Sequence, residues 1–330
     1  MRKNVFKLAM IVMALFVTTA CFAQAGKVNN FRIKRGTNVS HWLSQSEQRG
    51  EARRLHIQED DFARLSELGF DFVRIPIDEE QFWDEKGNKL PEAWDLLNLW
   101  RQLSAFLKDR SCDWVAYEFM NEPVAPEHEQ WNKLVAKVHK ALRALEPQRT
   151  LVVGSNMWQG HETMKYLKVP EGDKNIVLSF HYYNPMLLTH YGAWWSPLCA
   201  AYKGKIHYPG VLVSKEDFDA APAEIKDQLK PFTEQVWNID KIREQFKDAI
   251  EAAKKYDLQL FCGEWGVYEP VDREIAYNWY RDVLTVFDEF NIAWTTWCYD
   301  ADFGFWDQQR HCYKDYPLVE LLMSGKPLEK

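Results

Sequence analysis

The sequence predicts an α/β protein whose parallel sheet closes into a barrel. Stretches with strand character alternate with stretches of helical spacing, and several of the strands are apolar on both faces, as in parallel sheets covered by helices. The units are evenly spaced and the composition does not shift along the chain, which favours one barrel over two domains. The expected architecture is a TIM-type (β/α)8 barrel, here with about seven recognisable strands.

The strands and helices follow from local pattern. The expected strands begin at residues 35, 72, 114, 151, 176, 258 and 292. The helices between them show apolar residues at helical spacing: 62–68, 93–107, 131–145, a weak one at 162–167, 239–250, 276–290 and 318–323. Gly69 ends the first of these helices, and Pro147 follows the third. A long excursion from Asn184 to about Trp237 interrupts the alternation.

The first 23 residues are typical of a secretory signal peptide. Basic residues among the first seven precede an apolar run from Leu8 to Val17, and small residues follow. The run is too short to span a bilayer, so no transmembrane segment is expected. We expect cleavage near Ala23 and a secreted or periplasmic protein, with residues 24–330 forming a single barrel domain. A lipid anchor on Cys21 is the minority alternative.

Charge and cysteine content exclude several classes of function. Removing residues 1–23 leaves 38 basic against 48 acidic side chains, a balance that disfavours nucleic acid as a partner. Five cysteines then remain, without a repeated spacing, which argues against a disulfide framework or a zinc site, and we expect neither a metal nor a cofactor. The chain has 15 Trp, 14 Tyr and 19 Phe, more than a core needs, and surplus aromatic rings commonly line grooves for flat ligands such as sugars.

Two glutamates follow different expected strands. Asn121-Glu122-Pro123 ends one strand and Gly263-Glu264-Trp265 ends another, so the two carboxyls can face each other across a barrel mouth. An opposed pair of carboxyls suits glycoside hydrolysis, with one as nucleophile and the other as proton donor. A cation and a hydroxyl would hold the nucleophile ionised, which gives Arg74 and Tyr183 natural roles. Taken singly, each motif is more often structural, because Asn-Glu-Pro also starts helices.

The order of these motifs on successive strands resembles glycoside hydrolase family 5, the cellulase family, from about residue 33 to residue 310. The positions that match the family pattern are Arg74, Asn121, Glu122, His181, Tyr183, Glu264 and Trp297. The resemblance implies that Glu122 is the acid/base and Glu264 the nucleophile. It also implies that Asn121 binds the sugar 2-hydroxyl, that Arg74 and Tyr183 assist the nucleophile, and that Trp297 lies under the reacting sugar. His181 is expected to contact substrate.

One element of the family pattern is missing. The family places a further strand and helix, with an Asp-x-His motif, between Arg74 and Asn121, and no His occurs there. We expect a loss of roughly fifty residues near Asn98, the size of one strand-helix unit with its loop. A genuine deletion and a fault in gene assembly both explain it. The strands at Phe72 and Trp114 are then expected to lie side by side and parallel.

The resulting hypothesis is a secreted retaining glycosidase that cleaves a β-linked polysaccharide, cellulose-like β-glucan or a related hemicellulose. The alternative is a catalytically impaired relic that binds carbohydrate without cleaving it. The retaining mechanism requires the carboxyls of Glu122 and Glu264 to lie about 5–5.5 Å apart. The candidate groove residues are Trp42, Trp83, Trp158, Trp194, Trp195, Trp265 and Trp306. The oligomeric state is not predicted.

Overall fold

The computed structural model describes residues 28–77 and 96–325. Its centre is a parallel sheet of seven strands in the order β2-β1-β9-β8-β5-β4-β3. Each strand begins within two residues of its predicted start. The strands are β1 (Arg35–Asn38), β2 (Phe72–Arg74), β3 (Ala116–Glu118), β4 (Thr150–Gly154), β5 (Ile176–Tyr182), β8 (Gln259–Trp265) and β9 (Ala293–Thr296).

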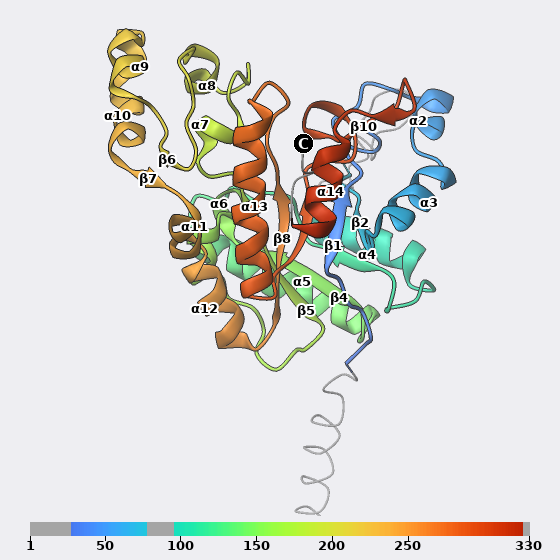
Figure 1. Ribbon diagram of the computed structural model, residues 1–330. Coiled ribbons are helices and arrows are strands. Elements are labelled where there is room, and N and C mark those ends of the chain that lie inside the picture. The colour runs from blue at the N-terminus through green and yellow to red at the C-terminus, as the bar shows by residue number, and fades with distance from the viewer. Residues whose placement is uncertain (1–27, 78–95, 326–330) are drawn as a thin grey trace, which may run out of the picture.

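Helices cover the outside of this sheet (Figure 1). The main ones are α2 (Gly50–His56), α3 (Glu59–Leu68), α4 (Leu96–Leu107), α5 (His128–Leu145), α11 (Ile239–Gln245), α12 (Lys247–Tyr256), α13 (Arg273–Glu289) and α14 (Tyr316–Ser324). Two short ones, α6 (Asn156–Gln159) and the 3-10 helix η3 (His161–Tyr166), follow β4. The alternation of strand and helix, with helices on the outer face, is the TIM-type barrel architecture that the sequence predicts.

Local chemistry fixes the helix ends. Gly69 ends α3 in the left-handed conformation, at φ 99°, where a residue with a Cβ atom is disfavoured. The side chain of Asp272 accepts hydrogen bonds from the first turn of α13, and Asp315 does the same for α14. These caps satisfy backbone donors that have no partner inside a helix.

The inward faces of the strands form a small apolar layer of their own. It consists of Ile33, Val152, Val177, Phe261 and Ala293, with Phe31, Phe72 and Ala116 packed against it. A much larger cluster lies between the sheet and the helices. Every residue of β4 and β5 is buried, and burial on both faces of the sheet explains why apolar residues predominate in these strands.

The prediction that the strands at Phe72 and Trp114 lie side by side is wrong. They are β2 and β3, which stand at the two ends of the sheet order, and no backbone pairing joins them in the described residues. Strand number, tilt and stagger are linked in a closed barrel, so seven strands at this curvature leave the ring open. Helix α4 runs without a break through the expected deletion point, as the helical pattern there predicts.

The excursion after β5 folds into short elements of its own, which lie beyond the carboxyl ends of the strands (Figure 1). They are α7 (Met186–Thr189), α8 (Pro197–Ala201), β6 (Gly210–Val211), α9 (Lys215–Ala220), η4 (Ala223–Ile225), α10 (Lys226–Glu234) and β7 (Val236–Trp237). A 3-10 turn, η5 (Ala301–Phe303), and a two-stranded hairpin, β10 (Trp306–Asp307) with β11 (Cys312–Tyr313), follow β9.

Some predictions fall outside the described residues. These are the signal peptide at 1–23, its alternative anchor at Cys21, and the groove candidate Trp83. Within residues 28–77 and 96–325, none of the helices combines the length and the apolar character needed to cross a membrane.

Candidate active site

The two predicted catalytic glutamates meet at the carboxyl ends of the strands. Glu264 is on β8 and Glu122 lies four residues beyond β3. A carboxylate oxygen of Glu122, a ring nitrogen of His181 and a carboxylate oxygen of Glu264 all lie within 4.8 Å of one another. His181, on β5, stands between them, with Nδ1 2.9 Å from Glu122 Oε1 and 3.7 Å from Glu264 Oε2. The side chain of Glu264 is almost completely buried, whereas that of Glu122 is 31% exposed.

Both carboxylate oxygens of Glu264 accept hydrogen bonds. Arg74 Nη1 donates to Oε1 at 2.8 Å, and the hydroxyl of Tyr183 donates to Oε2 at 3.1 Å. Burial, together with the charges of Glu264 and Glu122, raises the pKa of Tyr183 well above its usual value, so the phenol keeps its proton. The predicted contacts of Arg74 and Tyr183 with Glu264 are confirmed, and they stabilise negative charge on that carboxylate.

Arg74 holds four groups at once. Its Nε donates to Glu118 Oε2 at 2.6 Å, Nη1 also donates to Asn38 Oδ1 at 2.8 Å, and Nη2 donates to Asn121 Oδ1 at 2.6 Å. Burial alone would lower the pKa of Arg74, but the charges of Glu118 and Glu264 outweigh burial and raise it. Because Arg74 ends β2 and Glu118 ends β3, this side chain links the two edges of the open sheet where their backbones do not pair.

Sequence reasoning missed two residues of this network. Glu118 is the only acid in an otherwise apolar strand pattern, and that was the available signal. Burial raises the pKa of Glu118, but Arg74 outweighs this effect and holds the pKa below its usual value. Gln159, the last residue of α6, carried no sequence signal, yet its amide hydrogen-bonds Glu118 at 3.1 Å and the backbone N–H of Glu122 at 2.7 Å.

The assignment of Trp265 to substrate binding is wrong. Its side chain is fully buried and packs against aromatic rings of the helical layer, including Trp279, Tyr280 and Phe287. Successive residues of a strand point to opposite faces of the sheet. Since Glu264 points toward the other carboxyl, its neighbour Trp265 must point outward into the core.

The other tryptophans divide between core and surface. Trp306 is buried beneath the guanidinium of Arg64, at 3.8 Å, which removes it from the groove candidates. Trp42 is partly buried, with its indole N–H donating to the backbone of Arg53. Trp297 is partly buried directly after β9, and its sugar contact, like that of Trp42, stays a prediction. Exposed rings are provided by Trp158, Trp194 and Trp195.

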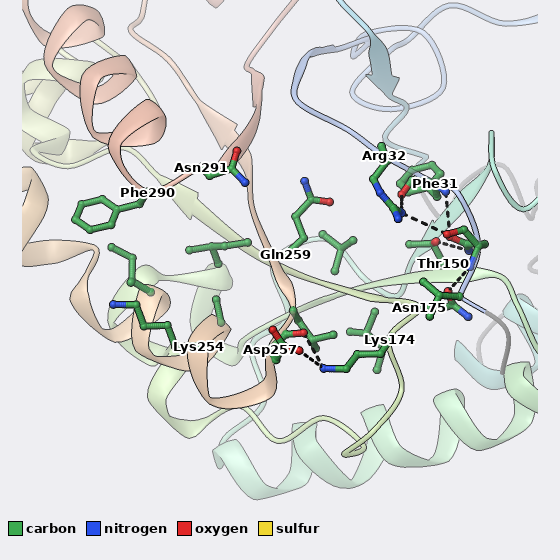
Figure 2. Close-up of a pocket in the computed structure, with 18 residues that line it drawn as sticks. Phe31, Arg32, Thr150, Lys174, Asn175, Lys254, Asp257, Gln259, Phe290 and Asn291 are labelled. Carbon is green, nitrogen blue, oxygen red and sulfur yellow. Dashed lines mark hydrogen bonds and ion pairs between the residues drawn. The ribbon is translucent and has the colours of Figure 1, made fainter. Parts of the chain in front are cut away.

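A cavity lies at the end of the sheet opposite the two glutamates, and Figure 2 shows the residues that line it. It has a volume of about 550 Å³ and is lined by residues at the amino ends of β4, β5 and β8, among them Thr150, Ile176 and Gln259. In this architecture the chemistry belongs to the carboxyl ends, so this cavity has no part in the glutamate site.

Among the described residues, one group has oxygen and nitrogen atoms close enough together to hold a metal ion. It consists of Glu122, His181 and Glu264. A cation would have to bind beside the guanidinium of Arg74, which is 2.8 Å from the same carboxylate. Like charge opposes that arrangement. The geometry fits a carboxylate pair working on a neutral substrate better than a metal centre.

Comparisons with known proteins find similarity along most of the chain. The model of the cellulase family, glycosyl hydrolase family 5, matches residues 78–303. Endoglucanase C of Acetivibrio thermocellus is 28% identical, over 84% of this chain and 94% of the relative. A solved endoglucanase structure superposes with a TM-score of 0.70 at 25% identity, over 88% of this chain and 97% of that one. A hyperthermophilic endo-β-1,4-glucanase in complex with substrate gives 0.69 at 25% identity, with 89% and 97% covered.

Proposed function

The chain belongs to the cellulase family, glycosyl hydrolase family 5, and from that premise we propose that it is a retaining endo-β-1,4-glucanase. As a member of this family, and by its likeness to endoglucanases, it is a glycosidase that hydrolyses O-glycosyl bonds of β-glucan. The proposal adds the stereochemistry, the linkage, the internal position of the cut and the roles of individual residues. Glu264 is the nucleophile and Glu122 the acid/base.

The short distance between the two carboxylates carries the proposal. Oxygens of Glu122 and Glu264 lie within 4.8 Å of each other. Retaining enzymes hold their carboxyl groups about 5–5.5 Å apart, whereas inverting enzymes need about 6.5–9.5 Å to admit a water molecule between carboxylate and sugar. The observed separation supports direct attack by a carboxylate on the sugar.

The surroundings of the two glutamates support different roles in the first step. Glu264, held by Arg74 and Tyr183, attacks the anomeric carbon as an anion, and the bond from that carbon to the leaving oxygen breaks. Glu122, more exposed and without an arginine, gives its proton to the leaving oxygen. The products are a glycosyl ester on Glu264 and a free sugar hydroxyl.

In the second step Glu122 acts as a general base and Glu264 is the leaving group. Glu122, now a carboxylate, takes a proton from water, and the water oxygen attacks the anomeric carbon. The ester bond to Glu264 breaks, and its electron pair returns to the carboxylate, which Arg74 and Tyr183 again stabilise. Two displacements at the same carbon give net retention of configuration.

Exposed aromatic rings support a polymeric substrate. Trp194 is 80% exposed, and its neighbour Trp195 packs edge-on against His190, which in turn contacts the ring of Tyr183. Flat apolar faces of this kind stack on sugar rings. The solved relative described as an endo-β-1,4-glucanase with substrate supports the β-1,4 linkage.

Two alanine variants test the roles. Glu264→Ala is expected to abolish turnover of every β-glucan and aryl cellobioside, because no other residue can form the ester. Glu122→Ala is expected to lose activity on cello-oligosaccharides but to keep the first step on a dinitrophenyl cellobioside, whose leaving group needs no proton. Exposed Glu171→Ala serves as the control and should be unchanged. Nuclear magnetic resonance of the first product should show the β-anomer.

Other outcomes would overturn the proposal. An α-anomer as first product would refute retention, and equal, mild losses in both variants would show that the wrong pair has been assigned. Binding of soluble glucan in affinity electrophoresis, without any cleavage by the unmodified protein, would favour the carbohydrate-binding relic.

Export is a separate proposal that rests on the sequence. The basic residues before the apolar run from Leu8 to Val17, with small residues after it, support cleavage near Ala23 and a secreted or periplasmic location. Sequencing the amino terminus of protein recovered from outside the cytoplasm would test it. A lipid-modified Cys21 as the first residue would establish the anchored alternative instead.

A further inference from the structure

The short element α6, after β4, contains a left-handed turn of three residues that are not glycine. Met157, Trp158 and Gln159 have φ values of 59°, 58° and 54°. Residues with a Cβ atom avoid this region because the Cβ atom crowds the following carbonyl oxygen. Such runs persist only where the surrounding structure holds them, and they cluster at functional sites. We therefore expect the side chains of this turn to make contacts that stabilise its left-handed backbone.

The side chain of Gln159 makes such contacts. It is completely buried, and all its polar atoms are used. Its Oε1 accepts from the backbone N–H of Glu122 at 2.7 Å, while Nε2 donates to Glu118 Oε1 and to Ser179 Oγ, both at 3.1 Å. The orientation of the amide follows from its partners, because an N–H needs an acceptor and a carboxylate needs a donor.

Through these bonds Gln159 reaches both proposed catalytic residues. One end holds the backbone of Glu122, which is itself left-handed at φ 45°. The other end holds Glu118, whose second oxygen binds Arg74 at 2.6 Å, and Arg74 binds Glu264 at 2.8 Å. A single buried amide thus connects the backbone of Glu122 to the chain of hydrogen bonds that reaches the carboxylate of Glu264.

The amide of Gln159 packs directly against the last residue of β4, Gly154. A Cβ atom added to Gly154 would overlap the side chain of Gln159 at three of its atoms. Gly154 has an ordinary φ, so its glycine character is explained by this close approach and not by its backbone conformation. The packing at Gly154 is independent of the hydrogen bonds and indicates the same fixed placement.

We propose that Gln159 is a positioning residue that sets the acid/base Glu122 and, through Glu118 and Arg74, the nucleophile Glu264. The inference rests on the proposed retaining mechanism. Because the only direct bond runs to the backbone of Glu122, loss of Gln159 impairs the acid/base function first. Effective placement of a catalytic group to within about 1 Å is worth about 10²-fold in rate.

The first test is Gln159→Met, which keeps the length of the side chain and removes its hydrogen bonds. The value of kcat/KM on cello-oligosaccharides is expected to fall about 10²-fold. On a dinitrophenyl cellobioside, azide is expected to restore turnover and give a glycosyl azide. Azide nitrogen forms a bond to the anomeric carbon, the ester bond to Glu264 breaks, and no proton transfer is required. Glu122→Ala is the positive control for this rescue.

A matched control separates positioning from general structure. Gln245 is a partly buried glutamine whose Oε1 accepts from the hydroxyl of Tyr182, and its side chain makes no hydrogen bond to Glu122 or Glu264. Gln245→Met also removes a hydrogen bond, and is expected to lower Tm without changing kcat or giving azide rescue. A structural role for Gln159 would make its variant behave like this control.

A second variant keeps the test decisive if Gln159→Met does not fold. Gly154→Ala leaves Gln159 in the sequence but displaces its amide, so the same azide-dependent rescue is expected. If the unmodified protein is active while either folded variant has unchanged kinetics, or has lost activity that azide does not restore, the inference is refuted. An unmodified protein that cleaves nothing would instead refute the proposed function.

Discussion

Single side chains at this site work by geometry as much as by charge. Arg74 binds four partners through three nitrogens, and only a planar guanidinium presents donors in that fixed fork. Its positive charge is shared between Glu118 and Glu264. A residue of equal charge but different shape would therefore keep part of the attraction to Glu118 and Glu264 but could not hydrogen-bond all four partners at once.

Arg74→Lys tests this distinction. The ammonium can contact only part of the set, so kcat/KM on cello-oligosaccharides is expected to fall by about 10²-fold or more while the protein stays folded. Arg64→Lys is the control, since Arg64 also binds two partners, Asp61 and Tyr299, but away from the glutamates. In thermal unfolding Arg64→Lys should show a lower Tm. In stopped assays its kcat/KM should be unchanged, whereas that of Arg74→Lys should be reduced. Unchanged kcat/KM in Arg74→Lys would show that charge suffices.

At the scale of elements, charged side chains tie helices to the loops that precede strands. Asp173, in the loop before β5, binds His139 Nε2 at 2.7 Å and Arg143 Nε at 2.6 Å, both on α5. Burial raises the pKa of Asp173, but these hydrogen bonds outweigh it and hold the pKa well below its usual range. A carboxylate with a lowered pKa stabilises the fold above its unfolded pKa of about 4 and loses that contribution as pH falls further.

Asp173→Asn is accordingly expected to lower the free energy of unfolding by about 1–3 kcal/mol at pH 7. The difference from the unmodified protein should shrink as pH falls below about 4, because the unmodified carboxyl is then protonated in the unfolded chain. Urea unfolding at pH 7, 5 and 3 measures it. Asp257→Asn, which breaks an exposed pair with Lys174, should leave the free energy of unfolding nearly unchanged, because water screens the pair. A constant difference at every pH would contradict the assignment.

At the scale of the whole molecule, the sheet is open where a closed barrel would have paired strands. β5 and β8 lie inside the sheet order and have seven residues each, whereas the edges β2 and β3 have three each. Edge strands with one partner open more easily than strands held on both sides. The side-chain network around Arg74 joins the edges at their carboxyl ends, so the site stays assembled although the ring is open.

Hydrogen exchange followed by mass spectrometry should reveal this division. Amides of β2 and β3 are expected to exchange at least about tenfold faster than those of β5 and β8, because local opening at an edge breaks fewer contacts. β1 is a short strand with partners on both sides and serves as the control for strand length. Equal protection of β1, β2 and β3 would show that the edges are closed in solution.

Much of this molecule follows from the sequence because the relevant patterns are local. The apolar runs that became β4 and β5 and the helical spacing that became α5 and α13 need no knowledge of distant residues. Parallel strands end at one edge, so residues just after them must gather there, which placed Arg74 and the two glutamates together. Side chains alternate between the two faces of a strand, so the position of Trp265 next to Glu264 in β8 also indicates that Trp265 points outward.

Tertiary structure alone decided how those parts fit. Whether β2 and β3 pair depends on the curvature summed over seven strands, which no local pattern encodes. The bonds of Gln159 join α6 to β3 and to the segment just after β3, with partners 37 and 41 positions away in the chain. Its left-handed backbone is stable only because the packed neighbours compensate for it. Sequence determines which groups reach the mouth of the barrel, and three-dimensional packing determines which atoms of those groups touch.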